Sequence, residues 1–361
     1  MAEILVCPLS WGLGHATRDV PVIREFLRHG HRVTIGTSGP ALALLKQEFP
    51  GCSFFLFPDY PAPYTRTPFF VARFTAFIPK MLRAIGREKA FLDRWLAENR
   101  CDLIVSDNRF GVFDRRVPSF FISHQLRFDV PPLLFPAGWV TEVFNGHYHR
   151  FFRRVIVPDN ESPDLRLSGK LSRSRRPGTA RRAYFAGLLS SVERRDLPAD
   201  IDCLFSVSGP EPQRTALEQV LLGQAPRLPG RKVLVLGRPA EHFRRRTGAD
   251  TLVISHASRA EMTELVNRAR FIVCRSGYTT MMELAEIGGK KALLVPTPGQ
   301  TEQEYLARYY LRRGWYFYRG QYGLDLPRDV RRAASFAGFP RMPGSRENAA
   351  RLYRECFAPW L

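Results

Sequence analysis

The stretch from Phe271 to Gly314 reads FIVCRSGYTTMMELAEIGGKKALLVPTPGQTEQEYLARYYLRRG. It opens with a short apolar run, turns at Arg275-Ser276-Gly277 and continues with a helical pattern over Tyr278–Ile287. A second apolar run, Lys291–Val295, leads through a loop of Pro and Gly to another helical pattern at Glu302–Arg313. Short apolar runs that alternate with helical patterns are typical of parallel strands joined by crossover helices. The stretch therefore predicts part of an α/β domain with a parallel sheet.

Small and polar residues follow the strands of this stretch, at the edge where open α/β sheets bind their ligands. Ser276 and Gly277 lie where a helix begins near Thr279, so free backbone N–H groups and the helix dipole are available to a phosphate. Glu283 lies less than two turns into that helix, from where a carboxylate can reach a ribose diol, although a solvated helix residue fits the same position. The loop after the next strand carries polar side chains that suit a sugar: Gln300, Gln303 and Glu304.

The same alternation begins earlier, at the strand Ile201–Ser208. That strand runs into a turn at Ser208-Gly209 and a helical pattern at Glu211–Leu222, so its backbone N–H groups suit a diphosphate and Arg214 adds positive charge. Further strands are expected at Lys232–Leu236 and at Thr251–Ser255, and His256 directly follows the second of them.

The amino-terminal half starts with a second α/β pattern. Glu3–Leu9 reads as a strand, Thr17–His29 as a helix and His31–Gly36 as another strand, which is a βαβ unit. Gly12 and Gly14 in the first turn allow positive φ and close backbone approach. The dinucleotide fingerprint requires a third Gly where Thr17 stands, so no nicotinamide cofactor is expected.

Two histidines and one aspartate in this half are candidates for acid–base chemistry. His15 directly follows Gly14 at a helix start, where the dipole keeps an imidazole neutral and able to accept a proton. Asp107 ends the strand Cys101–Ser106 and is placed to orient His15, although an Asx turn is an equally good explanation. His124 follows the strand Pro118–Ser123 and is a rival base or acceptor contact. The sequence does not rank the two histidines.

The charge balance predicts an anionic partner. The 361 residues include 54 Lys and Arg against 34 Asp and Glu, a formal net charge of +20. A genome whose composition favours arginine would give the same excess of positive charge without any anionic partner. No helix-turn-helix, zinc or RNP pattern is present, so we expect no nucleic-acid partner.

The six cysteines are scattered without metal-ligand spacing, which predicts a reducing compartment with neither disulfides nor bound metal. No apolar run is long enough to span a bilayer, and no signal peptide is recognisable, so we expect a cytoplasmic protein that is soluble or peripheral on the inner face of the membrane.

Two segments are rich in basic residues. Phe69–Asn99 is a helical stretch, interrupted at Pro79, in which aromatic and basic residues alternate; it either packs on its own sheet or docks on an anionic membrane surface. Gly169–Arg182 has six basic residues and no acidic one, and its Gly, Ser and Pro content predicts an exposed loop. We interpret Asp159–Pro198 as the end of the first domain and a connector.

The order C-R-S-G, E, P and Q-x-Y in the stretch from Cys274 to Tyr305 resembles the donor-binding region of MurG-like glycosyltransferases of the GT-B fold, over roughly residues 200–320. The resemblance implies that Glu283 holds the ribose, that Gln303 meets the sugar, and that the turns at Ser208 and Ser276 flank the diphosphate. It also places the loop at His256 against the base, which implies UDP. Two departures are Arg18, where the family usually carries Pro, and Gln303-Glu304, where it carries paired glutamines.

The hypothesis from the sequence is a GT-B enzyme with two Rossmann-like doubly wound α/β domains facing a central cleft. The acceptor domain spans residues 1–190, the donor domain spans residues 200–340, and a final helix within 341–361 packs back on the first domain. The enzyme transfers a sugar from a UDP-sugar to an acceptor hydroxyl with inversion and without a metal or cofactor, and a lipid-linked acceptor is one option. A UDP-sugar epimerase of the same fold and a basic nucleic-acid-binding protein are the alternatives.

Overall fold

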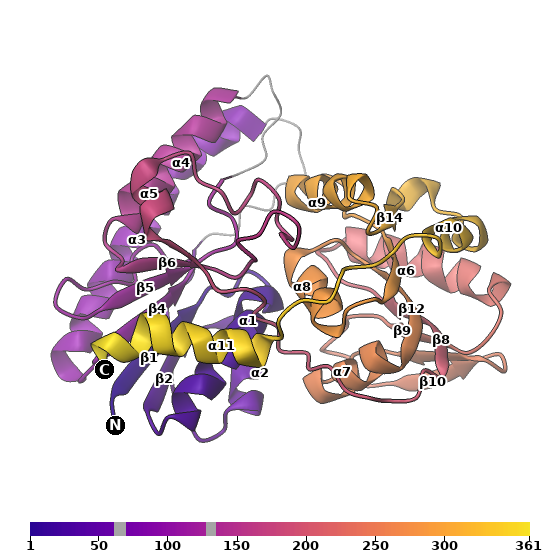
Figure 1. The fold of residues 1–361 in the computed structure, drawn as a ribbon, viewed down its shortest axis with the longest axis horizontal. Coiled ribbons are helices and arrows are strands. Elements are labelled where there is room, and N and C mark those ends of the chain that lie inside the picture. Colours follow the sequence, from indigo (N-terminus) through magenta and orange to yellow (C-terminus); the bar gives the residue numbers. More distant parts are fainter. Residues whose placement is uncertain (61–69, 128–134) are drawn as a thin grey trace. The chain divides into compact units, whose positions relative to one another are not determined.

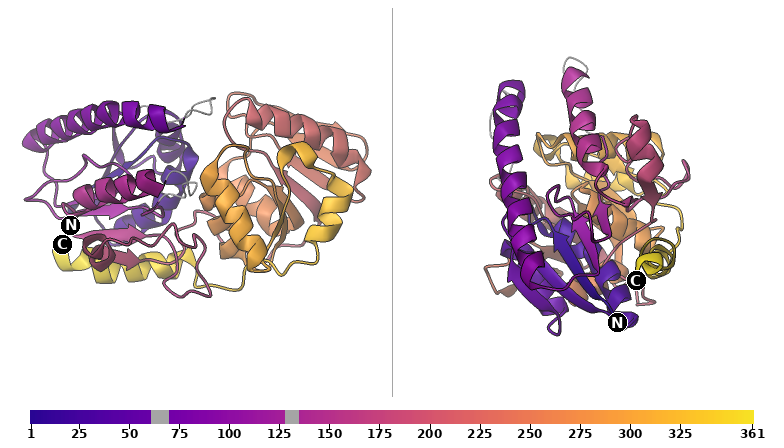
Figure 2. Two further views of the ribbon diagram at one scale, coloured as in Figure 1. Left: turned by 90° about the horizontal axis from the view of Figure 1, so that it is seen from above. Right: turned by 90° about the vertical axis from the view of Figure 1, so that its left-hand side faces the viewer.

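The computed structural model describes residues 1–60, 70–127 and 135–361, with residues 70–78 and 135–137 as backbone only. The chain forms two compact units. The first contains Met1–Ser191 and Gly344–Leu361, and the second contains Val192–Pro343. Both chain ends therefore belong to the first unit, where they lie near each other (Figure 2).

The first unit is built on a parallel sheet in which the strand order is β3-β2-β1-β4-β5-β6-β7. Every described pairing in this sheet is parallel, because each strand returns through a crossover connection. The strands are β1 (Glu3–Pro8), β2 (Arg32–Thr37), β3 (Ser53–Leu56), β4 (Leu103–Asp107), β5 (Ser119–Ile122), β6 (Arg154–Val157) and β7 (Ala183–Phe185).

Helices cover both faces of this sheet (Figure 1). Alternate residues of β1 point to opposite faces, so Ile4 and Val6 join one apolar cluster and Leu5 and Cys7 join another. The first cluster is completed by α1, α2 and α11, and the second by α3. The helices of the unit are α1 (Leu13–Arg28), α2 (Gly39–Glu48), α3 (Phe70–Glu98), α4 (Phe135–His149), α5 (Pro177–Arg182) and α11 (Ser345–Leu352).

The second unit repeats this plan with the strand order β10-β11-β9-β8-β12-β13-β14. Its pairings are parallel except at the edge, where β10 runs antiparallel to β11. The strands are β8 (Ile201–Ser206), β9 (Lys232–Val235), β10 (Arg244–Thr247), β11 (Thr251–Ile254), β12 (Ala269–Cys274), β13 (Lys291–Leu294) and β14 (Phe317–Tyr318). The helices are α6 (Gln213–Gln224), α7 (Arg259–Arg268), α8 (Tyr278–Ile287), α9 (Thr301–Arg312) and α10 (Leu326–Ala333).

Each sheet has one point at which the strand order reverses. In the first sheet the chain proceeds from β1 outward to β3 and then returns to the other side of β1 with β4. In the second sheet it proceeds from β8 outward and returns beside β8 with β12. Loops that leave neighbouring strands at such a point diverge to opposite faces, which opens a crevice for a ligand at the carboxyl ends of the strands.

Two expectations about local structure were wrong. Helix α3 continues through Pro79 and is not interrupted there, because the loss of one backbone hydrogen bond is outweighed by packing of its later turns, including Ala84, Ile85 and Leu92, on the unit. Phe69 lies outside the described residues.

The segment 169–182 is not an exposed loop. Leu171 and Ser172 are buried, and residues 177–182 form α5. The cause is the buried carboxylate of Asp159, which accepts hydrogen bonds from the backbone of Leu167 and Ser168 and from the Ser172 hydroxyl. The basic segment is thereby folded into the first unit, and β7 follows it as the last strand of the sheet.

Candidate active site

The reversal point of the first sheet brings His15 and Asp107 together. Gly12 precedes α1 with φ of 90°, a conformation that favours glycine, and His15 lies in the first turn of the helix. Asp107 is the last residue of the neighbouring strand β4. His15 Nδ1 and Asp107 Oδ1 lie 2.8 Å apart, the Asp107 side chain is fully buried, and 15% of the His15 side chain is exposed. Part of the imidazole therefore remains accessible to a ligand.

Arg18 connects this pair to His124. It lies one turn after His15 on α1, and only 2% of it is exposed. Its Nε donates to one carboxylate oxygen of Asp107 and its Nη2 to the other, while Nη1 lies 2.8 Å from His124 Nδ1. The structure thus joins both candidate histidines into one network through an arginine to which the sequence analysis gave no role. Its spacing of three residues from His15 was the available signal, because such residues share a helix face.

The hydrogen bonds of this network give the two histidines different roles. His15 Nδ1 lies 2.8 Å from Asp107 Oδ1 and also 2.8 Å from Arg18 Nη2. A carboxylate only accepts, and Arg18 Nη2 already donates to Asp107, so we assign the proton of His15 to Nδ1 and a lone pair to Nε2. A guanidinium only donates, so Arg18 requires an unprotonated Nδ1 on His124, whose proton then lies on Nε2. His15 is accordingly arranged as a base and His124 as a hydrogen-bond donor.

The charges around His15 favour its neutral form. Burial lowers the pKa of His15, and Arg18 lowers it further, against the opposing effect of Asp107. Burial alone would raise the pKa of Asp107, but Arg18 and His15 hold it well below its usual range. Burial and then the charge of Asp107 raise the pKa of neighbouring Asp19 well above its usual range, so we expect Asp19 to be neutral and Asp107 to carry the charge.

In the second unit, the reversal point brings together the two turns expected to flank a diphosphate. Ser208 and Gly209 follow β8, and Gly209 has φ of 114°. Ser276 and Gly277 follow the neighbouring strand β12, and Gly277 is the N-cap of α8 with Thr279 in its first turn. The Ser276 hydroxyl donates to the carbonyl of Gln303 at 2.8 Å, so this side chain attaches the turn after β12 to α9. Backbone N–H groups at the start of a helix such as α8 suit an anion.

Arg275 holds the loops of this site together. The side chain is 1% exposed and donates to the carbonyls of Ser208 at 3.2 Å, Val295 at 3.1 Å and Gln213 at 2.9 Å. It also donates to the Gln321 side chain at 2.7 Å. None of these acceptors is charged, and burial lowers the pKa of Arg275 to about 10, so it remains cationic at neutral pH. A buried cation with neutral acceptors, next to the turns at Ser208 and Gly277, suits an anion, and Arg275 was not among the site residues predicted from the sequence.

Arg214 differs from its expected role as a free cation. Its guanidinium donates to Glu211 at 2.6 Å and to Glu218 at 2.7 Å, so its charge is already balanced by one carboxylate of α6 and one that precedes the helix. The electrostatic contribution expected of Arg214 is better matched by Arg275.

Glu283, the residue predicted to contact a ribose, is half-buried on α8. It lies in the second turn of α8, with 13% of its side chain exposed, and accepts a hydrogen bond from Arg259 at 3.3 Å. Burial raises the pKa of Glu283, and Arg259 opposes this shift. Arg259 begins α7, three residues after His256, which is exposed at the end of β11. Arg259 therefore connects the loop that carries His256 to Glu283 on α8.

The loop after β13 is shaped by the three polar residues expected to meet the sugar. Gln303 accepts from the backbone N–H of Thr297 at 2.9 Å and donates to the Gln300 side chain, while Glu304 accepts from the N–H of Gly299 at 3.1 Å. The Thr297 hydroxyl is buried and has no hydrogen-bond partner among the described residues. A buried polar atom without a partner is costly, so this hydroxyl marks a position that a ligand can satisfy. Thr297 was not among the site residues predicted from the sequence.

The described residues contain no group of His, Cys, Asp or Glu side chains arranged to hold a metal ion. Within the same residues, no helix is long and apolar enough to cross a membrane.

The comparisons with known proteins agree with this architecture. Residues 215–323 match the family model described as the glycosyltransferase family 28 C-terminal domain. No curated protein sequence gives a significant match. The family match classes the chain as a glycosyltransferase, and the matched residues contain Arg275, Glu283 and Gln303.

Solved structures show the same fold along almost the whole chain. CalG4, the calicheamicin glycosyltransferase, aligns with a TM-score of 0.62 at 16% identity and covers 98% of this chain and 94% of its own. MurG of Acinetobacter baumannii aligns with a TM-score of 0.54 at 14% identity and the same coverage. The spinosyn rhamnosyltransferase SpnG, complexed with thymidine diphosphate, aligns with 0.57 at 14% identity, covering 99% and 96%. The predicted GT-B fold is confirmed.

Proposed function

We propose that the protein transfers a sugar from a UDP-sugar to an acceptor hydroxyl, with inversion at the anomeric carbon and without a metal. His15 Nε2 takes the proton of the acceptor hydroxyl, and the oxygen forms a bond to the anomeric carbon. The bond between that carbon and the diphosphate oxygen breaks, and UDP leaves with the electron pair. The observation that carries the proposal is the His15–Asp107 contact at the sheet's reversal point, which favours the tautomer with an unprotonated Nε2.

The second unit supports the donor half of the proposal. The N–H groups at Gly209 and Gly277 and the cation of Arg275 suit the diphosphate, whose negative charge increases as the bond breaks. Glu283 suits the ribose hydroxyls, and the amides of Gln300 and Gln303 suit those of the sugar. These groups supply charge stabilisation from the protein itself, which is the basis for proposing metal independence.

The His15→Ala variant tests the base. We expect kcat to fall by about 10²–10⁴-fold, because the acceptor hydroxyl then loses its proton without a positioned base. UDP affinity is expected to be unchanged, because the donor groups lie in the second unit. His124→Gln is the matched comparison, since it removes a histidine of the same network that we assign as a donor. A His15→Ala enzyme with normal turnover and normal UDP affinity would refute the assignment.

The nucleotide is tested by calorimetric binding of UDP, GDP, dTDP and ADP, each with and without EDTA. Selective binding of UDP that EDTA does not change is the expected result. The dTDP arm is necessary because one structural neighbour is described in complex with thymidine diphosphate. Incubation of the UDP-sugar without acceptor distinguishes transfer from the alternative epimerase activity, which forms a new UDP-sugar under that condition.

A peripheral contact with anionic membrane remains a proposal for the outer face of α3. Lys80, Arg83 and Arg87 are exposed there, next to Leu82, which is 45% exposed. Trp95 is not available for such a contact, because it stacks on Phe55 with ring centroids 5.1 Å apart. Flotation with anionic vesicles, compared between wild type and a Lys80→Gln/Arg83→Gln variant, tests the surface, and equal flotation of both counts against it.

A further inference from the structure

A basic hollow of about 660 Å³ lies in the first unit at the amino-terminal ends of β5, β6 and β7. Three loops line it, and each enters one of these strands with at least one arginine. Arg115 precedes β5, Arg150 and Arg153 precede β6, and Arg182 ends α5 directly before β7. Because the strands are parallel, this hollow is at the opposite end of the sheet from Asp107, which ends β4. It is therefore separate from the proposed acid–base site.

The positive charge of the basic hollow is not balanced by the protein. Arg115, Arg150 and Arg153 form no ion pair with any described residue. Arg182 donates to the backbone carbonyl of Gly178 at 3.2 Å and contacts no described carboxylate. The one lining carboxylate, Asp114, accepts from Arg116 at 3.1 Å. Four guanidinium groups thus line one concave surface, where like charges repel unless an anion binds between them.

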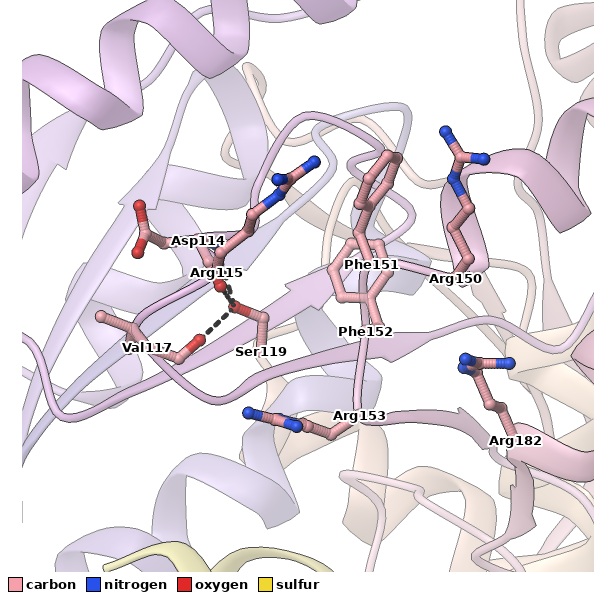
Figure 3. Close-up of a pocket in the computed structure, with 9 residues that line it drawn as sticks. All are labelled: Asp114, Arg115, Val117, Ser119, Arg150, Phe151, Phe152, Arg153 and Arg182. Atoms are coloured by element: carbon pink, nitrogen blue, oxygen red, sulfur yellow. Dashed lines mark hydrogen bonds between the residues drawn. The ribbon is translucent and has the colours of Figure 1, made fainter.

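Aromatic rings form the floor of the hollow and hold its arginines in place. Figure 3 shows Phe151 and Phe152 with the four arginines arranged around them. Phe151 stacks on Phe113 with centroids 4.4 Å apart, and the Arg150 guanidinium lies 4.8 Å from the centre of the Phe151 ring. Arg153 lies 4.5 Å from the centre of the Trp360 ring. These cation–π contacts restrict the two guanidinium groups, which lowers the entropy lost when they bind a ligand.

We propose that this hollow is a binding site for a multiply charged phosphate group. A guanidinium presents paired N–H donors that match two phosphate oxygens, and several such groups suit a dianion or diphosphate better than a single carboxylate. The volume falls within the range of sites for small ligands. The phosphate belongs either to a soluble phosphorylated compound or to an anionic lipid headgroup, and the chemistry that recognises it is the same.

Two probes distinguish these sources. Inorganic pyrophosphate, titrated by calorimetry, represents the soluble ligand. Flotation with phosphatidylcholine vesicles, with and without phosphatidic acid, whose phosphomonoester can carry two negative charges, represents the headgroup. Because the proposed donor site also suits a diphosphate, the test compares variants that differ only at the hollow: Arg115→Gln/Arg150→Gln, with Arg245→Gln/Arg246→Gln on exposed β10 of the second unit as the control of equal charge change.

The hollow variant is expected to bind pyrophosphate or the anionic vesicles about tenfold more weakly than wild type, since it loses charge-assisted hydrogen bonds that the control retains. Loss of the pyrophosphate signal identifies a soluble ligand, and loss of the vesicle signal alone identifies a headgroup. If the hollow variant binds pyrophosphate and the anionic vesicles as tightly as the control and the wild type do, the proposal is overturned. Arg153→Gln/Arg182→Gln provides a second variant if the first unfolds at a lower temperature than wild type.

Discussion

At the scale of single residues, Arg18 is the centre of the network that prepares His15. Its positive charge keeps Asp107 ionised and opposes protonation of His15. It also fixes the tautomer of His124, so one side chain separates the roles of two histidines that the sequence left as equal candidates. Its position three residues after His15 is the place where MurG-like sequences usually carry Pro.

Replacement of Arg18 is expected to change the pH dependence of turnover. Because Arg18 lowers the pKa of His15, Arg18→Gln raises that pKa, and His15 becomes protonated at a higher pH. The acid limb of kcat/KM, which lies below about pH 6.5 in the wild type, then moves upward. Arg18→Lys retains the charge and serves as the control. Profiles of kcat/KM from pH 5 to 9 check this, and identical acid limbs in wild type and Arg18→Gln would contradict it.

Thr297 gives a second prediction, in which stability and binding change in opposite directions. Thr297→Val removes a buried hydroxyl for which the described part of the chain offers no hydrogen-bond partner, so the ligand-free protein is expected to be as stable as wild type or more so. Donor binding is expected to weaken if the ligand satisfies that hydroxyl. Urea unfolding and calorimetry with the UDP-sugar measure the two effects. Unchanged donor affinity would show that Thr297 lies outside the site.

At the scale of secondary-structure elements, a buried ion pair attaches α3 to the loop after β4. Glu88 and Arg109 are 1% and 0% exposed and lie 3.0 Å apart. Glu88 also accepts from the backbone N–H of Gly111 at 2.7 Å, and Arg109 donates to the carbonyl of Pro8 at 3.0 Å. The helix, the first strand and the loop after Asp107 are therefore linked through one pair of charges.

Loss of Glu88 leaves the buried Arg109 with only the more distant carboxylate of Asp59, at 3.5 Å, as a counter-charge among the described residues. Glu88→Ala is expected to lower the free energy of unfolding by about 3–5 kcal/mol. Glu98→Ala, at the exposed end of the same helix, is the control and is expected to change stability little. Urea unfolding of both variants measures the difference. Equal midpoints would mean that α3 is held by its apolar face alone.

The sequence predicted the elements that have a clear apolar pattern. The expected helix Tyr278–Ile287 coincides with α8, and the strand expected at Glu3–Leu9 ends one residue earlier as β1. The edge strand β10 reads RRRT and is exposed throughout, so it has no apolar alternation that would reveal it. The fold of the segment 169–182 depends on hydrogen bonds that Asp159 accepts from Leu167, Ser168 and Ser172, which are 8, 9 and 13 residues away, and local patterns do not encode them.

In the candidate site as well, the sequence predicted the positions of residues but not the contacts between their side chains. Glycine turns and strand ends placed Gly12, His15, Asp107, Ser208 and Gly277 at the correct sheet edges, because the carboxyl ends of parallel strands share one edge. The roles of Arg18 and Arg275 depend on which atoms meet in space. Arg214 and Arg275 are both arginines beside a turn, and only their partners distinguish them: carboxylates for Arg214 and neutral carbonyls for Arg275.

At the scale of the whole molecule, the first unit is completed by the end of the chain. After the second unit, α11 returns and contributes Ala349 and Leu352 to the core that contains α1 and β1 (Figure 1). The second unit is a single continuous segment with its own apolar core. Because each unit has its own apolar core, a ligand that binds to one unit can stabilise that unit separately.

This separation predicts where a nucleotide protects the chain. All donor groups proposed here belong to the second unit, so UDP is expected to slow hydrogen exchange at the turns near Gly209, Gly277 and Thr297, and less in the first unit. At 100 times its Kd, a ligand stabilises the unit that binds it by about 2.7 kcal/mol. Exchange mass spectrometry with and without UDP measures this, and Glu283→Gln is the control that should weaken the effect. Protection concentrated at Gly12–Arg18 would instead assign the nucleotide to the first unit and would require the donor and acceptor roles to be exchanged.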